Sequence, residues 1–299
     1  MPTSYCRTFF SALLIASVTA PAIAQKPFPA ATRAAIESAI GRKGTPNPGG
    51  VLRFGFPRGD LHVVANGITL NPAFALGSWV AFQPIGDHAM AMGDLVLLET
   101  EVESVMASLQ QNGIEQTALH NHLLGESPRV MYMHIRAIGN ATRIAKAVRT
   151  ALDFTATPAP ATASAVAAPI DLDTAALARA IGVHGKVNGG VYQLSIPRRE
   201  KIRVEKHEVP AAMGVATAIN FQPTGSGQAA ITGDFVLTTR EVNAVIWALN
   251  QAGIKVTAIH SHMLDEQPRL FFMHFWANDD AVKLARGLRS ALDRTAVKR

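Results

Sequence analysis

The chain has 299 residues, of which 48% are hydrophobic and 17% charged, and its formal net charge is +6. This length and composition predict one large or two ordinary globular domains and exclude a disordered chain. The Lys and Arg residues are scattered, so the small positive excess does not predict a nucleic-acid-binding surface. The single cysteine excludes a disulfide framework, a zinc site built from cysteines and an iron–sulfur cluster.

Residues 1–24 have the features of a secretory signal peptide. Arg7 ends a short basic segment, residues 9–18 are apolar, and the sequence Ala-Ile-Ala that ends at Ala24 suits signal peptidase. The apolar run is shorter than the roughly 20 residues of a membrane span, and no later stretch reaches that length. We predict cleavage before Gln25 and a mature periplasmic or secreted protein without a membrane span. An uncleaved N-terminal anchor is the alternative.

The remaining sequence contains one unit twice. Gly93–Leu97 recurs as Gly233–Leu237, and Thr117–His122 recurs at the same spacing as Thr257–His262. Repetition at a fixed spacing over so many positions predicts two homologous tandem domains.

The two copies are joined by residues 154–169, which are uncharged and rich in Ala, Pro and Thr. Such a composition is typical of an extended linker. We therefore predict a first domain over residues 25–153 and a second over residues 170–299. The two copies can pack against each other as a pseudo-dimer.

The apolar spacing within one copy predicts both helices and strands. Thr100 and Glu103 are expected to form a capping box that begins the second helix. In chain order the expected elements are a helix over 31–40, strands over 49–56, 61–65, 78–83 and 94–98, a helix ended by Asn112-Gly113, strands over 116–123 and 130–137, and a helix over 140–152. Each domain is therefore predicted to be α+β, with a mostly antiparallel sheet and helices packed on one face.

Six of the ten histidines belong to the repeated motif, and the other four have no counterpart. The six are His120, His122 and His134 in the first copy and His260, His262 and His274 in the second. Residues i and i+2 of a strand share a face, and a returning strand can place His134 directly opposite His120, about 5 Å away. A slip of one residue would turn His134 to the other face. Three imidazoles on one face can bind a divalent metal and leave a position open for water; a purely structural role is the alternative.

Charged residues near the histidines are weaker candidates. Glu126 and Glu266 lie in the turn before Pro-Arg and can serve as a general base or a fourth ligand, although turn carboxylates are usually solvated. Arg129 and Arg269 open the next strand and can hold an anionic group or pair with that glutamate.

Other repeated residues receive a structural interpretation. Asp94 and Asp234 follow a glycine and are predicted to be turn residues. Glu101 and Glu241 are assigned to helix capping and to the helix dipole. Met133 and its counterpart precede the last histidine of each copy, so their parity predicts a place in the core on the opposite face.

The second copy is expected to hold the stronger site. Trp276 has the same parity as His274 and is predicted to wall the pocket. The matching residue of the first copy is Arg136, whose guanidinium would weaken cation binding by about a hundredfold if it lay beside the histidines. An Arg136 side chain that points past the edge of the sheet would have little effect.

The repeated motifs resemble a known family. Gly-Asp-(Leu/Phe)-Val-Leu, Thr-Ala-(Leu/Ile)-His-x-His-(Leu/Met)-Leu, Pro-Arg and Met-His occur in both copies. Together they resemble the LppY/LpqO family of mycobacterial envelope lipoproteins, a domain of unknown function. The chain departs from the family in having a plain signal without a lipobox. The resemblance implies an exported envelope protein and supplies no reaction.

The sequence thus predicts an exported protein that binds a divalent metal, with zinc as the first choice, through its His-x-His…His clusters. A hydrolase in which the metal activates water and Glu126 or Glu266 acts as the base is the activity that such a site would support. The alternative is a non-enzymatic envelope module, for binding or scaffolding, in which the histidines are structural. In both cases the partner is an unspecified small molecule or envelope component.

Overall fold

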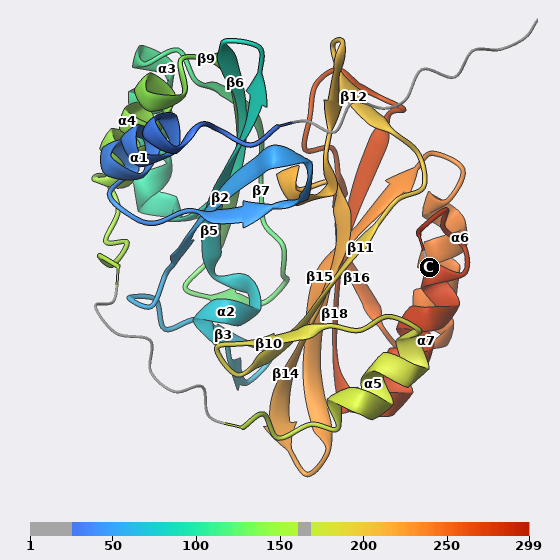
Figure 1. Ribbon diagram of the computed structural model, residues 1–299. Helices are drawn as coiled ribbons and strands as arrows, with labels where there is room; N and C mark the ends of the chain where they lie inside the picture. The colour runs from blue at the N-terminus through green and yellow to red at the C-terminus, as the bar shows by residue number, and fades with distance from the viewer. Residues whose placement is uncertain (1–25, 161–168, 299) are drawn as a thin grey trace, which may run out of the picture.

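The computed structural model describes residues 26–160 and 169–298. This part of the chain forms two similar halves, each a six-stranded antiparallel sheet with helices on one face (Figure 1). The predicted α+β class with two similar tandem units is therefore confirmed. The expected signal peptide, and residues 161–168 of the expected linker, lie outside the described residues.

The first half contains a large sheet of order β1-β2-β5-β6-β9-β7 and a small sheet of order β4-β3-β8. Its elements are α1 (Ala30–Ile40), β1 (Thr45–Asn47), η1 (Pro48–Gly50), β2 (Val51–Pro57), β3 (Val64–Ala65), β4 (Ile68–Thr69), α2 (Pro72–Ala75), β5 (Gly77–Ile85), β6 (His88–Leu98), η2 (Glu99–Glu101), α3 (Val102–Gln111), β7 (Glu115–His120), β8 (Glu126–Ser127), β9 (Val130–Gly139) and α4 (Ala141–Leu152).

The second half repeats this plan with a large sheet of order β10-β11-β14-β15-β18-β16 and a small sheet of order β13-β12-β17. Its elements are α5 (Thr174–Ile181), β10 (Lys186–Asn188), β11 (Val191–Pro197), β12 (Ile202–Val204), β13 (His207–Val209), η3 (Ala211–Met213), β14 (Ala216–Gly225), β15 (Gln228–Thr238), α6 (Val242–Gln251), β16 (Lys255–His260), β17 (Glu266–Gln267), β18 (Leu270–Asp280) and α7 (Ala281–Leu292).

The start of the second helix differs from the expectation. Thr100 does not cap α3, because residues 99–101 form a 3-10 turn and α3 begins at Val102. The Glu101 carboxylate instead accepts a hydrogen bond from the Leu98 backbone amide at 2.8 Å. The predicted Thr100–Glu103 capping box is therefore absent, and Glu101 alone caps the start of the 3-10 turn.

One face of each large sheet packs on its helices and forms a separate apolar core. In the first half, alternate residues of β6 and β9, such as Leu95 and Met133, are fully buried against α1, α3 and α4. Met273 takes the same place in the second half. This confirms the prediction that the two methionines lie in the core and face away from the histidines.

The faces of the two sheets that point away from the long helices lie toward each other, with the short α2 between them (Figure 1). The packing is reciprocal, because apolar residues around each small sheet cover part of the other half's large sheet. In one contact, Val204 and Met213 of the second half pack with Ala81 and Met92 of the first. In the other, residues of the first half, Phe74 among them, pack with residues of the second. The two halves therefore form a pseudo-dimer within one chain.

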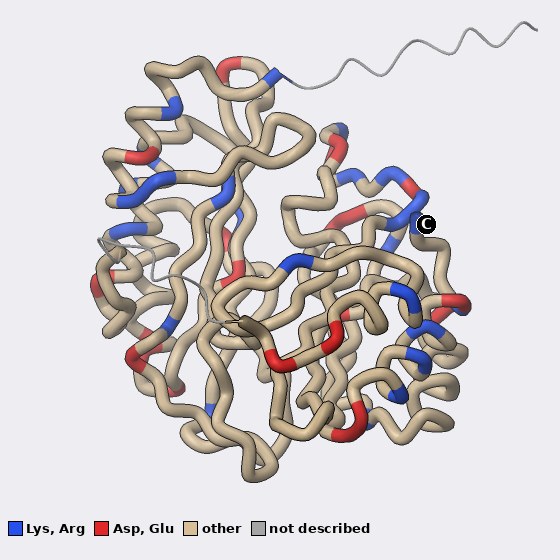
Figure 2. The backbone as a smooth tube through the Cα atoms, turned by 60° about the horizontal axis from the view of Figure 1, so that its bottom comes forward, with Lys and Arg blue, Asp and Glu red and all other residues tan. Residues whose placement is uncertain are grey.

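Basic and acidic residues are interspersed over both halves (Figure 2). Among the described residues, no helix combines the length and the apolar character needed to cross a membrane.

Candidate metal centre

In each half the repeated histidines lie on the last two strands of the large sheet or just beyond them, and these strands are β9 and β7 in the first half and β18 and β16 in the second. His134 in β9 is opposite Asp94 of β6 on one side and Ala118 of β7 on the other. His120 is opposite Tyr132, so the expected direct pairing of His120 with His134 is wrong by two residues. The pairing differs because β7 ends at His120 and part of the turn forms β8, which pairs with β3 instead. An even shift preserves parity, so the histidines still share one face.

All six repeated histidines meet in one cluster between the two sheets. Three pairs of rings stack across the boundary, with ring centroids at 3.6 Å for His120 and His260, 3.7 Å for His122 and His274, and 3.6 Å for His134 and His262. The last two pairs are equivalent under the repeat, and the first pair joins two equivalent residues. The two predicted clusters therefore form a single composite one.

Two hydrogen bonds between the halves fix the backbone on which the cluster stands. The Thr117 hydroxyl donates to the His262 carbonyl at 2.6 Å, and the Thr257 hydroxyl donates to the His122 carbonyl at 2.7 Å. His122 and His262 each lie two residues beyond the end of a strand, where no backbone hydrogen bonds to a neighbouring strand would position them. Each half therefore positions one histidine of the other.

Asp94 and Asp234, predicted to be turn residues, lie inside the sheets and beside the histidines. Oδ1 of Asp94 is 3.8 Å from Nε2 of His134, and Oδ2 of Asp234 is 3.9 Å from Nε2 of His262. The turn interpretation is wrong because the preceding glycines serve packing. A Cβ at Gly93 would lie 2.8 Å from the Trp79 carbonyl oxygen, and one at Gly233 would meet another strand even more closely.

The donor atoms of these eight side chains form four overlapping groups, within which all atoms lie within 4.8 Å of one another. Two groups are equivalent and belong to one half each, and two combine both halves. They are Asp94–His122–His134, Asp234–His262–His274, His120–His134–His262 and His120–His260–His274. The group within each half contains the aspartate in place of the first histidine of the predicted trio.

Most of the polar atoms in this cluster are buried without a hydrogen-bond partner. They comprise eight imidazole nitrogens and one carboxylate oxygen from each aspartate. Buried polar atoms normally have partners, and leaving one without costs about 1–3 kcal/mol. A cluster of ten such atoms is typical of a site that completes its bonding with an ion or with water.

Burial makes the uncharged forms of these side chains favourable. Desolvation, together with repulsion from His260, lowers the pKa of His120 to about 3, and desolvation lowers that of His260 to about 4. The pKa values of the other four histidines also lie well below the usual range, mainly through burial. Burial raises the pKa of Asp94 to about 7 and that of Asp234 well above its usual range. Neutral imidazole is the form that ligates metals.

The two turn glutamates proposed as bases hydrogen-bond to the backbone of their own turns. Glu126 accepts from the Val130 amide at 3.3 Å, and its Oε2 is buried without a partner. Glu266 accepts from the Leu270 amide at 2.7 Å. Desolvation raises the pKa of Glu126 to about 7. Glu126 therefore keeps a buried oxygen without a hydrogen-bond partner, but neither glutamate is among the residues that line the cavity or form the metal-ligating groups.

The arginines of the same turns lie at the surface. Arg129 is exposed and pairs with Glu99 at 3.5 Å. Arg269 donates to the carbonyls of its own turn and contacts Glu266 at 3.3 Å. Among the described contacts, neither guanidinium is paired with a residue of the histidine cluster.

Arg136 and Trp276, the basis of the expected difference between the copies, contact the opposite half. Arg136 pairs with Glu115 at 2.8 Å and, across the boundary, with Asp265 at 2.6 Å. Two carboxylates thus offset the charge that was expected to repel a cation. Trp276 is buried against Phe74 of the first half, with ring centroids 6.1 Å apart. Its role as a pocket wall stays a prediction.

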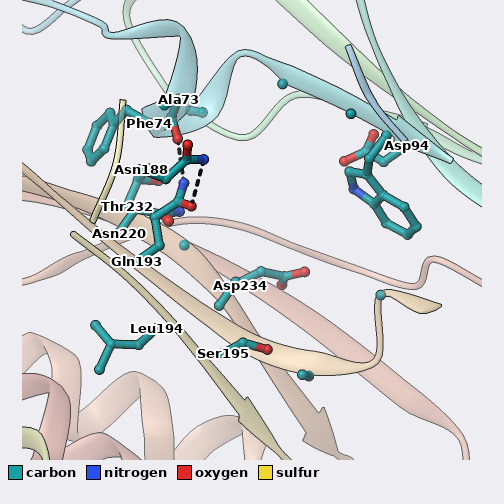
Figure 3. A pocket seen from close by; sticks show the side chains of 18 of the residues that line it. Ala73, Phe74, Asp94, Asn188, Gln193, Leu194, Ser195, Asn220, Thr232 and Asp234 are labelled. Carbon is teal, nitrogen blue, oxygen red and sulfur yellow. Dashed lines mark hydrogen bonds between the residues drawn. The ribbon is translucent and has the colours of Figure 1, made fainter. Parts of the chain in front are cut away.

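A cavity of about 1000 Å³ adjoins the cluster, and its lining includes Asp94 and Asp234. Figure 3 shows these two aspartates on strands of opposite halves, with amide and hydroxyl side chains such as Asn220 and Ser195 along the same space. The cavity gives a small polar molecule access to the candidate metal ligands.

Residues 34–154 and 175–294 match the model of a family described as Domain of Unknown Function (DUF1259). The chain belongs to this family. The two matched segments fall in the two halves of the structure, so the chain carries two tandem copies of the DUF1259 domain. Among curated proteins, none matches the sequence.

Three microcompartment shell proteins are similar to the chain among solved structures. They are the double-ringed trimeric shell protein MSM0271 from the RMM microcompartment (12% identity, TM-score 0.20, 70% of this chain and 84% of that one), the trimeric shell protein PduB (15%, 0.19, 81% and 87%) and EtuB from Clostridium kluyveri (12%, 0.22, 84% and 91%). These TM-scores are too low to establish a common fold.

Each copy of the DUF1259 domain also contains a buried arginine that the sequence analysis missed. Arg58 is fully buried and pairs with Glu101 and Asp60, in each case at 2.8 Å. Arg198 pairs in the same way with Glu241 and Glu200. Both copies contain Pro-Arg with an acidic residue two positions after the arginine, which could have indicated an ion pair. The sequence did not show that the arginine also pairs with a glutamate 43 residues later. These ion pairs tie the start of the helix to the end of β2 or β11.

Proposed function

We propose that this protein binds a divalent metal ion, with zinc as the first choice, at the composite cluster of six histidines and two aspartates. The observation that carries the proposal is the set of buried nitrogen and oxygen atoms without hydrogen-bond partners. Histidine and carboxylate ligands suit zinc and neighbouring transition metals.

The distances support a shared ion better than direct pairing. The separations of 3.8 Å and 3.9 Å between aspartate oxygen and histidine nitrogen are too long for hydrogen bonds. Two ligands that each lie about 2.1 Å from one ion are separated by at most about 4.2 Å. The two equivalent groups, one around Asp94 and one around Asp234, provide places for two ions related by the repeat.

A purely structural cluster fits these observations less well. Stacked imidazoles can contribute to packing, but a structural core would be better served by apolar rings that leave no polar atom unpaired. Aromatic rings do stack on two of the histidines: the ring centroids are 3.3 Å apart for His122 and Tyr132 and 3.6 Å apart for His262 and Phe272. The histidines occupy the positions closest to the aspartates, where ligands are needed.

An ion beside an accessible cavity would support hydrolysis, because a metal lowers the pKa of a bound water and makes it a nucleophile. Glu126 is the better of the two proposed bases, because it has a free carboxylate oxygen. A binding module that uses the ion only to hold a ligand is the alternative, and turnover of a ligand distinguishes the two.

The proposal also includes export. The resemblance to the LppY/LpqO envelope proteins and the pattern of residues 1–24 support a periplasmic or secreted protein. Mass spectrometry of the mature protein should find Gln25 at its N-terminus. A retained Met1, or a lipid on Cys6, would contradict this part of the proposal.

Metal analysis tests the central part. The purified protein is loaded with zinc, desalted and assayed for bound metal beside the double variant His134→Ala/His274→Ala. The control is His88→Ala/His207→Ala, which removes two histidines outside the cluster. We expect at least one zinc per wild-type or control chain and loss of most of it in the cluster variant. A wild-type content below about 0.3 per chain would contradict the proposal.

A further inference from the structure

The cavity beside the candidate metal centre has one strongly polar feature that metal binding does not explain. Arg53, in β2, lines the cavity, and its guanidinium lies 3.8 Å from the centroid of the Trp79 ring. Its Nη1 donates to the Ala212 carbonyl of the opposite half at 2.8 Å. Trp79 is in turn held by the backbone of Gly214, where a Cβ would lie 2.6 Å from the ring. Arg53 is therefore positioned from both halves.

Arg53 lacks the counterion that comparable arginines of this chain have. Arg58, Arg136 and Arg198 are buried, and each pairs with two carboxylates. Within the described part of the chain, no carboxylate oxygen lies within 4.0 Å of the Arg53 nitrogens. Desolvation lowers the pKa of Arg53 to about 10, which still leaves it charged at neutral pH. A desolvated cation without a partner is unfavourable unless an anion pairs with it.

Asp94, whose charge acts on Arg53 from a distance, does not fill this role. Its carboxylate lies beside His134 and belongs to one of the metal-ligating groups. Asp94 is therefore shared with the ion in the proposed metal centre, and the free donors of the Arg53 fork are left for a ligand. A planar guanidinium recognises carboxylate and phosphate groups with two parallel hydrogen bonds.

The repeat shows that this cation is specific to one end of the cavity. The residue that matches Arg53 in the second half is Gln193, whose amide donates to the Ala73 carbonyl at 2.7 Å. Both side chains therefore donate a hydrogen bond to the opposite half, but only Arg53 carries a positive charge. A ligand with a single acidic group would bind in one orientation only.

The remaining lining suits hydroxyl groups. Asn188, Ser195, Asn220 and Thr232 present amides and hydroxyls along the cavity, on the side of the second half (Figure 3). Such side chains both donate and accept hydrogen bonds, as a polyhydroxylated molecule requires. The volume of about 1000 Å³ is ample for a molecule the size of a sugar.

We propose that the cavity binds a small hydroxylated anion, a sugar-sized molecule with one carboxylate or phosphate group that pairs with Arg53. Its hydroxyl groups contact the amide and hydroxyl side chains of β11 and β14, and its far end reaches the metal group around Asp234, which pairs with β14 two residues from Asn220. The contact with Arg53 is independent of the metal, whereas the contact at the far end rests on the proposed function.

Calorimetric titration at neutral pH and low salt tests this proposal with glucuronate, glucose 6-phosphate and glucose as the probes. We expect the wild type to bind at least one of the two anions with a Kd below about 1 mM, and glucose at least about tenfold more weakly. The anion that binds more tightly identifies the acidic group. Failure of both anions to bind would overturn the proposal.

The substitution Arg53→Gln installs the residue that the second half already carries, so the sheet should accept it. We expect it to weaken anion binding at least about tenfold while the zinc content stays that of the wild type. Arg203→Gln, at an exposed arginine, is the matched control and should bind as the wild type does. Equal affinity in the Arg53→Gln variant would overturn the proposal, even if metal binding were established.

The same titration on metal-free protein separates the two contacts. Anion binding without metal supports the Arg53 contact alone, and tighter binding after zinc loading supports the contact at the far end. Identical affinities in the two forms would overturn the far-end contact and leave the Arg53 site in place.

Discussion

His120 and His260 lie face to face across the boundary between the two halves, with ring centroids 3.6 Å apart. They are equivalent residues of the repeat, so the approximate twofold relationship between the halves passes between their rings. Every other member of the cluster has its counterpart on the opposite side. The two DUF1259 domains therefore build one composite cluster, to which each contributes its own Asp–His–His group and in which two further groups combine residues of both.

The approximate twofold relationship favours two equivalent metal groups, whereas the sequence favours a stronger second one. Because Arg136 is paired with two carboxylates, its charge gives no reason for weak binding near the first copy. We predict that Asp94→Asn and Asp234→Asn each weaken zinc binding by about 10–100-fold, in line with the loss of one ligand or its support. Competition with a chromophoric chelator measures the affinities. Loss confined to one variant would contradict the equivalence of the two groups.

Parity along the strands was sufficient to predict that the histidines share a face. The position of Asp94 beside His134 was not predictable, because the register between β6 and β9 depends on pairing over the whole length of both strands. The contact between His120 and His260 was not predictable either, because the way in which two sheets pack on each other produces no periodic pattern in the sequence of either copy. Asp94 was predicted to be a turn residue because it follows Gly93, but the role of that glycine is close contact with the neighbouring strand, which is a tertiary feature.

The two glycines before the aspartates provide a graded test of this packing. A Cβ at Gly233 would lie 2.0 Å from the Ala218 carbonyl oxygen, whereas one at Gly93 would lie 2.8 Å from that of Trp79. We predict that Gly233→Ala lowers the free energy of unfolding by about 3 kcal/mol or more and Gly93→Ala by about 1–3 kcal/mol. Urea unfolding measures both, with Gly55→Ala, whose Cβ would meet no atom within 4 Å, as the control. The reverse order would contradict the packing described.

The buried arginine of each copy should contribute strongly to stability. Removing Arg58 leaves the carboxylates of Glu101 and Asp60 without their partner in a partly buried place. We predict that Arg58→Met lowers the free energy of unfolding by about 3–5 kcal/mol. Arg149→Met, which removes a surface pair with Asp153, should change it by less than about 1 kcal/mol. Similar effects of the two substitutions in urea unfolding would show that the buried pairs are not structural.

Glu126 predicts a dependence of stability on pH. Burial raises its pKa from 4.5 to about 7 in the folded protein, so the protonated form is favoured by folding. The contribution of the protonated carboxyl group to the free energy of unfolding is fully present below about pH 4.5 and is lost as the pH rises through 7. We predict that the free energy of unfolding of Glu126→Gln gains about 1–2 kcal/mol relative to the wild type between pH 5 and pH 8, measured on metal-free protein, because partial exposure of the carboxylate screens the effect. Glu99→Gln, at an exposed carboxylate, should show no such trend.

The most direct measurement of the central claim is an anomalous difference map, collected at the zinc edge, from crystals of the zinc-loaded protein. The structure predicts strong peaks between the two sheets, within ligand distance of the Asp94–His122–His134 and Asp234–His262–His274 groups. A map with zinc only at surface sites such as His88, or with no peak between the sheets, would contradict the claim that the paired DUF1259 domains build a metal centre.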